Sequence, residues 1–91
     1  MSKLHKDIPR MIRSLNIIEQ YNNFRQLGAK EDIDYLKKQV NELYNIKDIS
    51  ILVESFLWCA KMINMYLDEI EPEFKTFYLK EEIEKENELK S

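Results

Sequence analysis

The chain contains very few residues that break a helix. Its 91 residues include one glycine and two prolines, whereas folds rich in β-strands need turn residues at short intervals. Glu, Lys, Leu, Ile and Met are abundant, and all of them favour helices. A chain of this length makes one domain. The sequence therefore predicts a single all-α domain, residues 1–91, folded as a small three- or four-helix bundle with antiparallel neighbours.

The glycine and the prolines also divide the chain into segments. Pro9 suits the first turn of a helix and Gly28 suits a left-handed C-terminal cap. Asp48 or Ser50 can cap a third helix, and Pro72 ends that helix and starts a fourth. The expected helices span residues 8–27, 30–45, 49–70 and 72 onward. The ends expected to be mobile are residues 1–7 and 86–91.

The third segment is the most apolar part of the chain. Thirteen of the seventeen residues in "ILVESFLWCAKMINMYL" (51–67) are apolar. A membrane span needs about 20 such residues, and Glu54 and Lys61 interrupt this one, so we expect no membrane crossing. On a helix, the polar residues fall within about 120°. The residues opposite them are expected in the core, with this helix central to the bundle: Leu52, Phe56, Cys59, Ile63 and Ile70.

One flank of this helix is the first candidate binding surface. Four apolar side chains lie along one margin of the polar strip: Ile51, Trp58, Met62 and Met65. A bundle of four helices seldom covers about 240° of one member, and exposed contiguous apolar surface usually marks an interface. Trp is a frequent interface anchor and Met adapts to irregular partners. The alternative is that another helix of the bundle covers Trp58.

A second candidate surface lies on the first helix. Bases and aromatics share the side opposite its core face: Arg10, Arg13, Tyr21 and Phe24. The favoured interpretation is packing against a second neighbouring helix, with the Arg stems lying over apolar surface. The alternatives are a protein interface and a nucleic-acid surface, since bases contact phosphates and aromatics can stack. A helix-turn-helix motif is disfavoured, because its recognition helix would begin with Glu31, Asp32 and Asp34 and would meet phosphates with acids.

Reactive residues do not cluster in the sequence. There is one His, His5, and one Cys, Cys59, so no zinc or di-iron spacing occurs. One glycine rules out a glycine-rich phosphate loop. The acidic run "DEIEPE" (68–73) lacks the pattern of a calcium loop and is expected to be a solvated helix junction. We therefore expect no enzyme activity, no metal, no cofactor and no small-molecule substrate.

Charge is spread unevenly along the chain. Residues 1–30 hold six basic against two acidic side chains, whereas residues 66–91 hold four against nine. This asymmetry can favour contacts within the bundle or between copies. The N-terminal residues lack the apolar segment of a signal peptide. The lone Cys fits a reducing cytoplasm or a secreted protein that needs no disulfide, and we expect a cytoplasmic protein.

These observations together predict a small non-enzymatic regulator, inhibitor or adaptor that binds another protein or itself, as a homodimer. Lys, Asn, Ile and Tyr are frequent and Arg is rare. The frequent residues have AT-rich codons, which suggests a phage or a low-GC bacterium. The alternatives are a nucleic-acid-binding transcriptional regulator and a structural subunit of a larger assembly.

Overall fold

The computed structural model of the chain describes residues 3–90. These residues form helices and no strand, so the all-α prediction is confirmed. Residues 1–2 and 91, which belong to the ends predicted to be mobile, lie outside the described residues. The α-helices are α1 (Ile8–Arg25), α2 (Lys30–Glu42), α3 (Ile49–Asp68) and α4 (Pro72–Lys90). Two short 3-10 helices are η1 (Lys3–Asp7), before α1, and η2 (Leu43–Asn45), after α2.

The connection between α1 and α2 is organised by a buried asparagine. Gln26 takes the left-handed conformation (φ 55°) that ends α1, two residues before the expected cap at Gly28, which is also left-handed (φ 73°). Asn22 is buried, and its Oδ1 accepts the backbone N–H of Ala29 at 2.9 Å. Its backbone oxygen accepts the N–H groups of Gln26 and Leu27. One residue therefore satisfies three donors of the turn, which is why α1 ends early.

The start of α3 is fixed by a side-chain cap, as predicted. Asp48 is extended, and its Oδ1 accepts the backbone N–H groups of Ser50 at 2.9 Å and Ile51 at 3.2 Å. An N-cap of this kind contributes about 1 kcal/mol. It also fixes where the helical turns begin, and hence which side chains of α3 face outward.

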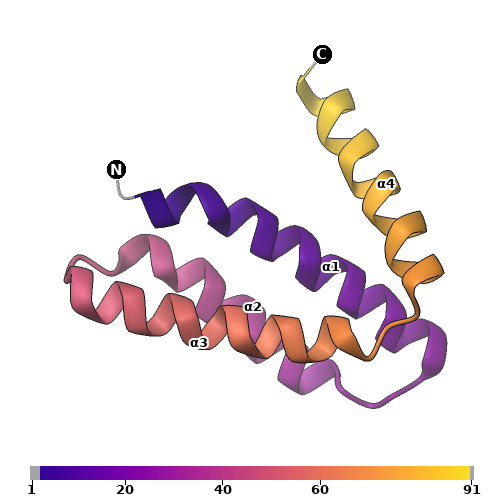
Figure 1. Cartoon of the computed structure of the whole chain (residues 1–91), viewed down its shortest axis with the longest axis horizontal. Coiled ribbons are helices and arrows are strands. Elements are labelled where there is room, and N and C mark those ends of the chain that lie inside the picture. The colour runs from indigo at the N-terminus through magenta and orange to yellow at the C-terminus, as the bar shows by residue number, and fades with distance from the viewer. Residues whose placement is uncertain (1–2, 91) are drawn as a thin grey trace.

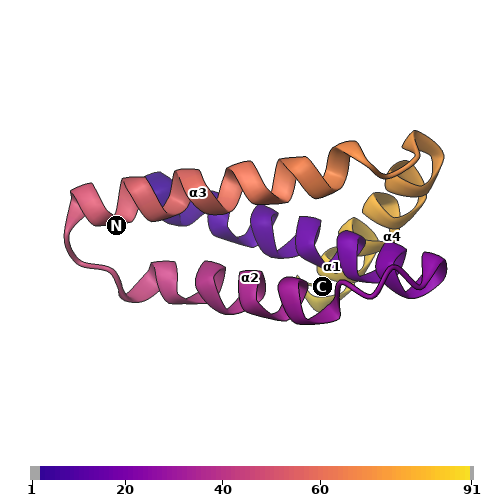
Figure 2. The same cartoon turned by 90° about the horizontal axis from the view of Figure 1, so that it is seen from below.

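The helices α1, α2 and α3 lie side by side, and each runs opposite to the one before it (Figures 1 and 2). Their apolar stripes meet in one cluster of buried residues. From α1 and α2 the largest fully buried side chains are Ile8, Leu15, Ile33 and Val40, and from α3 the buried residues are Leu52, Cys59 and Ile63. An ion pair between Lys37 Nζ and Glu19 Oε2, 2.8 Å, joins α2 to α1 at the edge of this core.

The central helix is α1, not α3 as the apolar content predicted. α1 packs against α2, α3 and α4, whereas α3 has only slight contact with α4. The reason lies in the direction that α4 takes after Pro72: it turns away from α3 and crosses the far end of α1 (Figure 1). The most apolar helix, α3, therefore lies at the edge of the bundle and exposes much of its surface to water.

An aromatic cluster holds α4 on α1. Phe74 packs edge-on against Tyr21, with ring centroids 5.0 Å apart, and lies 5.7 Å from Phe24. An ion pair joins Arg25 to Glu71 at the junction of the helices. Farther along, Asn16 Nδ2 donates to Glu82 Oε2 at 3.3 Å. The remainder of α4 projects from the three-helix unit as an arm (Figures 1 and 2).

Candidate interaction surface

The packing of α3 determines its outward face. Leu52, Cys59 and Ile63 are each less than 5% exposed, and Phe56 packs against the same cluster, as the helical projection predicted. Burial removes the Cys59 thiol from water and raises its pKa. Because this core side is fixed, the opposite side of α3 must face solvent over its whole length.

The predicted flank is exposed at three of its four positions. The exposed fractions are 53% for Ile51, 44% for Trp58 and 55% for Met65. Met62 is different, since it is half-buried and packs against the core cluster. It therefore belongs to the border of the core. We call the exposed set Ile51, Trp58 and Met65 the tryptophan row.

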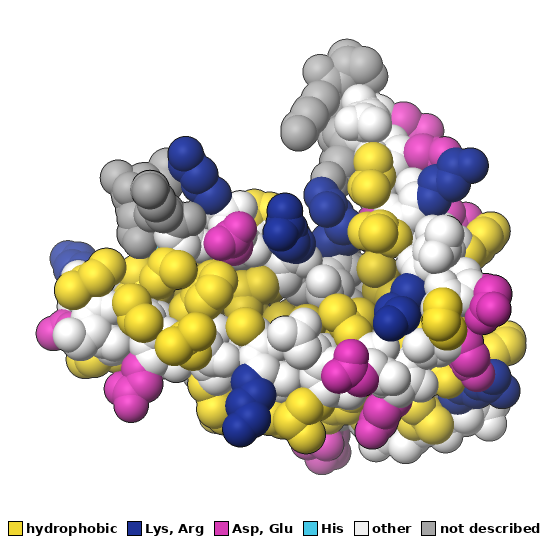
Figure 3. All heavy atoms as spheres, viewed as in Figure 1, with side chains coloured by type: hydrophobic (Ala, Val, Ile, Leu, Met, Phe, Trp, Pro, Cys, Tyr) yellow, Lys and Arg dark blue, Asp and Glu magenta, His cyan; other side chains and the backbone are white. Residues whose placement is uncertain are grey.

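A second apolar row borders the polar strip on its other side. Ile49, Val53 and Leu57 are exposed by 60%, 40% and 61%. Figure 3 shows hydrophobic side chains gathered over the N-terminal half of α3, next to charged ones. This row was not predicted from the sequence. Helical periodicity shows that these residues lie away from the centre of the core face, but it does not show which flank of α3 a neighbouring helix covers.

Charged and polar residues separate the two rows. Glu54, Lys61 and Asp68 follow each other at intervals of seven residues along the solvent side, and all three are exposed. Within residues 3–90, Glu54 and Lys61 take part in no ion pair. Seven residues of helix separate them by about 10.5 Å, so they cannot reach each other within one chain.

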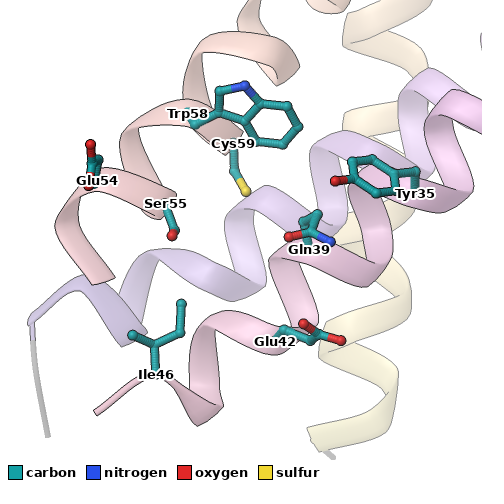
Figure 4. A pocket seen from close by; sticks show the side chains of 8 residues that line it. All are labelled: Tyr35, Gln39, Glu42, Ile46, Glu54, Ser55, Trp58 and Cys59. Carbon is teal, nitrogen blue, oxygen red and sulfur yellow. The ribbon is translucent and has the colours of Figure 1, made fainter. Parts of the chain in front are cut away.

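An open pocket of about 300 Å³ lies beside the tryptophan row, between α2 and α3. Figure 4 shows Trp58 and Tyr35 on its two sides, and their rings meet edge-on with centroids 6.3 Å apart. The Tyr35 ring is itself 57% exposed. The other lining residues are Gln39, Glu42, Ile46, Glu54, Ser55 and Cys59. The pocket extends the apolar margin of α3 onto α2, with carboxylates at its rim.

The basic and aromatic residues of α1 do not form one open stripe. Tyr21 is buried under α4, Phe24 is 64% exposed but touches Phe74, and Arg13 is half-buried. Arg10 is exposed at the N-terminal end of α1. The neighbouring helix that covers this side of α1 is α4, which packs on the C-terminal half of α1. Tyr21 is therefore placed in the core and cannot stack on a base.

Glu71 is the residue of the acidic junction that pairs with Arg25 among the described contacts. Partial desolvation would raise the pKa of Glu71, but hydrogen bonds from Tyr21 and Arg25 lower it below the usual carboxyl value. Within the described part of the chain, no three His, Cys, Asp or Glu residues are grouped to hold a metal ion. His5 lies in η1 with its ring 5.6 Å from that of Tyr44, and its buried Nε2 has no hydrogen-bond partner among the described residues.

Across residues 3–90, no helix is both long and apolar enough to cross a membrane. Comparisons of the chain with protein-family models, with curated proteins and with solved structures find no match. Function must therefore be argued from the surface itself.

Proposed function

We propose that the chain is a small non-enzymatic interaction protein of the cytoplasm, and that the solvent face of α3 is its binding surface. The observation that carries the proposal is the exposure of two apolar rows on one helix. Six large apolar side chains there each expose 40–61%: Ile49, Ile51, Val53, Leu57, Trp58 and Met65. Contiguous apolar surface of this kind usually serves an interface.

The composition of the face supports protein recognition. Trp58 gives a large aromatic anchor next to an open pocket, and Met65 gives an adaptable one. Charged residues between the rows can set the orientation of a partner, since rim charges contribute more to specificity than to affinity. The rest of the chain acts as a scaffold in this proposal: α1 and α2 hold α3 from one side and leave the other side free.

Less supports a nucleic-acid-binding role. The aromatic residues that would stack on bases are engaged with α4, and the free part of the α1 surface reduces to Arg10 and its neighbourhood. A structural subunit of a larger assembly would use the same α3 face and would differ only in how many copies take part.

The test compares charged substitutions on and off the face. Met65→Lys and Leu57→Lys each place a charge in one apolar row, and both positions are more than half exposed. Phe77→Lys is the matched control, because Phe77 is 58% exposed on α4. Light scattering and affinity capture from the native source would follow self-association and partner retention. At least one α3 variant should lose an association that the wild type and the control retain. Equal behaviour of all four proteins would contradict the proposal.

A further inference from the structure

The solvent face of α3 carries a pattern that is complementary to itself when reversed. Glu54 and Lys61 have opposite charges, are exposed, and lack ion-pair partners within residues 3–90. The tryptophan row runs beside them with the same spacing of seven residues, at positions 51, 58 and 65. Because seven residues make nearly two turns, each set forms a line along the helix.

We infer that two copies of the chain pair through α3 in antiparallel orientation, with the two-fold axis close to Trp58. This inference rests on the proposed function, and it specifies the partner as a second copy. In an antiparallel pair related by such an axis, each line of residues faces the same line of the other copy. The tryptophan row therefore meets the tryptophan row, and the charged line meets the charged line.

The two lines require the same register. Setting Ile51 opposite Met65 of the second copy places the axis at residue 58. Setting Glu54 opposite Lys61 of the second copy places it halfway between residues 57 and 58. The two positions differ by half a residue, which is about 0.75 Å along a helix. Apolar contact and charge pairing can therefore form together, and the symmetry gives each ion pair twice.

The charges also oppose the other arrangements. In a parallel pair the two-fold axis runs along the helices, so the charged line of one copy meets the tryptophan row of the second copy and the opposite-charge contacts are lost. An antiparallel pair shifted by one heptad sets Lys61 beside Lys61 and Glu54 beside Asp68, or else Glu54 beside Glu54. Both shifted registers create like-charge contacts, which are unfavourable across an interface. At the margins of the favoured register, Lys47, just before the cap of α3, approaches Asp68 at the end of the second copy.

The exposed area is large enough for such a contact. A compact monomer of 11.1 kDa is expected to expose about 5,700 Å², whereas this chain exposes 6,769 Å². The chain therefore exposes about 1,100 Å² more than such a monomer. A standard interface buries about 800 Å² on each partner, so the excess is of the size that one such interface covers.

The experiment is a charge exchange read by light scattering and sedimentation across about 1 µM to 1 mM protein. Wild type should show twice the 11.1 kDa mass at high concentration. Glu54→Lys and Lys61→Glu alone should each weaken the dimer roughly 10- to 100-fold, because symmetry converts two attractive contacts into two repulsive ones. The double variant should dimerise within about threefold of wild type. A mixture of the two single variants should form a heterodimer of similar strength, since it restores both opposite-charge contacts.

Controls separate register from general charge effects. Glu84→Lys and Lys80→Glu make the same charge changes on exposed positions of α4, and they should leave the dimer unchanged. Met65→Lys should abolish it, whereas Leu57→Lys, in the row outside the contact, should not. Circular dichroism checks that every variant is folded.

The possible failures are distinguishable. A wild type that remains monomeric at the highest concentration overturns the dimer, while loss of a different partner on Met65→Lys or Leu57→Lys retains the proposed function. A dimer that Met65→Lys abolishes but the charge exchange does not affect overturns the antiparallel register alone. A dimer insensitive to every α3 substitution overturns the α3 pairing, and the proposed function fails too if no other partner depends on that face.

Discussion

Phe74 is the main apolar anchor of α4, and its replacement should loosen that helix without unfolding the rest. Its half-buried ring stacks on Tyr78, with centroids 4.4 Å apart, and packs edge-on against Tyr21 at 5.0 Å. Tyr78 also packs against the core cluster, whereas the hydrogen bond of Asn16 with Glu82 and the ion pair of Arg25 with Glu71, just before α4, are polar and partly exposed and contribute little. The attachment of α4 therefore depends chiefly on the Phe74 ring and the Tyr78 ring stacked on it.

The magnitude follows from burial. Removing a fully buried Phe costs about 3–5 kcal/mol, and a half-buried ring accounts for about half of that. We therefore expect Phe74→Ala to reduce the free energy that holds α4 on α1 by about 2 kcal/mol. If α4 detaches and reattaches faster than its amides exchange, a loss of this size makes the backbone amides of α4 exchange with solvent about 30-fold faster.

The assay measures α4 and the three-helix unit separately. Hydrogen exchange of peptides from α4 reports its attachment, and the fluorescence of Trp58 during urea unfolding reports the packing of α2 and α3. The matched control is Phe77→Ala, which removes an exposed ring from the same helix and should cost less than about 0.5 kcal/mol. Unchanged exchange in Phe74→Ala would refute the anchoring argument. An equal loss in the Trp58 transition would refute the separation of α4 from the core.

Three further outcomes follow from buried or paired groups. Cys59 is buried and its pKa is raised by desolvation, so a thiol reagent at pH 8 should label it much more slowly in the native protein than in denaturant. The pKa of Glu71 is lowered, since hydrogen bonds from Tyr21 and Arg25 outweigh partial desolvation. The stabilisation of the folded state by ionised Glu71 is therefore fully present above the usual carboxyl pKa of about 4.3, and it is lost as the pH falls through the lower pKa of the folded state. NMR signals of α4 should therefore shift on acidification in wild type, and this part of the shift should be absent in Glu71→Gln. Asn22→Ala removes the acceptor of a loop N–H at 2.9 Å, which should destabilise the fold by about 1–3 kcal/mol in urea titrations.

Residues whose position depends on helical period alone were predictable. Leu52, Cys59 and Ile63 recur at spacings that only one face of a helix provides, and the structure buries all three. The cap at Asp48 was predictable for a similar reason, because an acceptor side chain just before an apolar helix has few other uses there. The helical period decides which residues share a face, and the cap depends only on the residues next to it.

The placement of α4 was not predictable. Its apolar residues do not line up on one side beyond Leu79, and Phe77 and Ile83 remain exposed, so the sequence gives no direction for docking. The destination is set by aromatic contacts with Tyr21, a residue 53 positions before Phe74. For the same reason the central position of α1 and the exposure of the Ile49, Val53 and Leu57 row appeared only in three dimensions.

The position of α4 on α1 also divides the molecule into parts that can open separately. Local opening takes place where few apolar contacts are buried, and α4 packs on α1 and has at most slight contact with α3. Opening of α4 alone therefore exposes the rings of Tyr21 and Phe74 and leaves the outward side of α3 as it was.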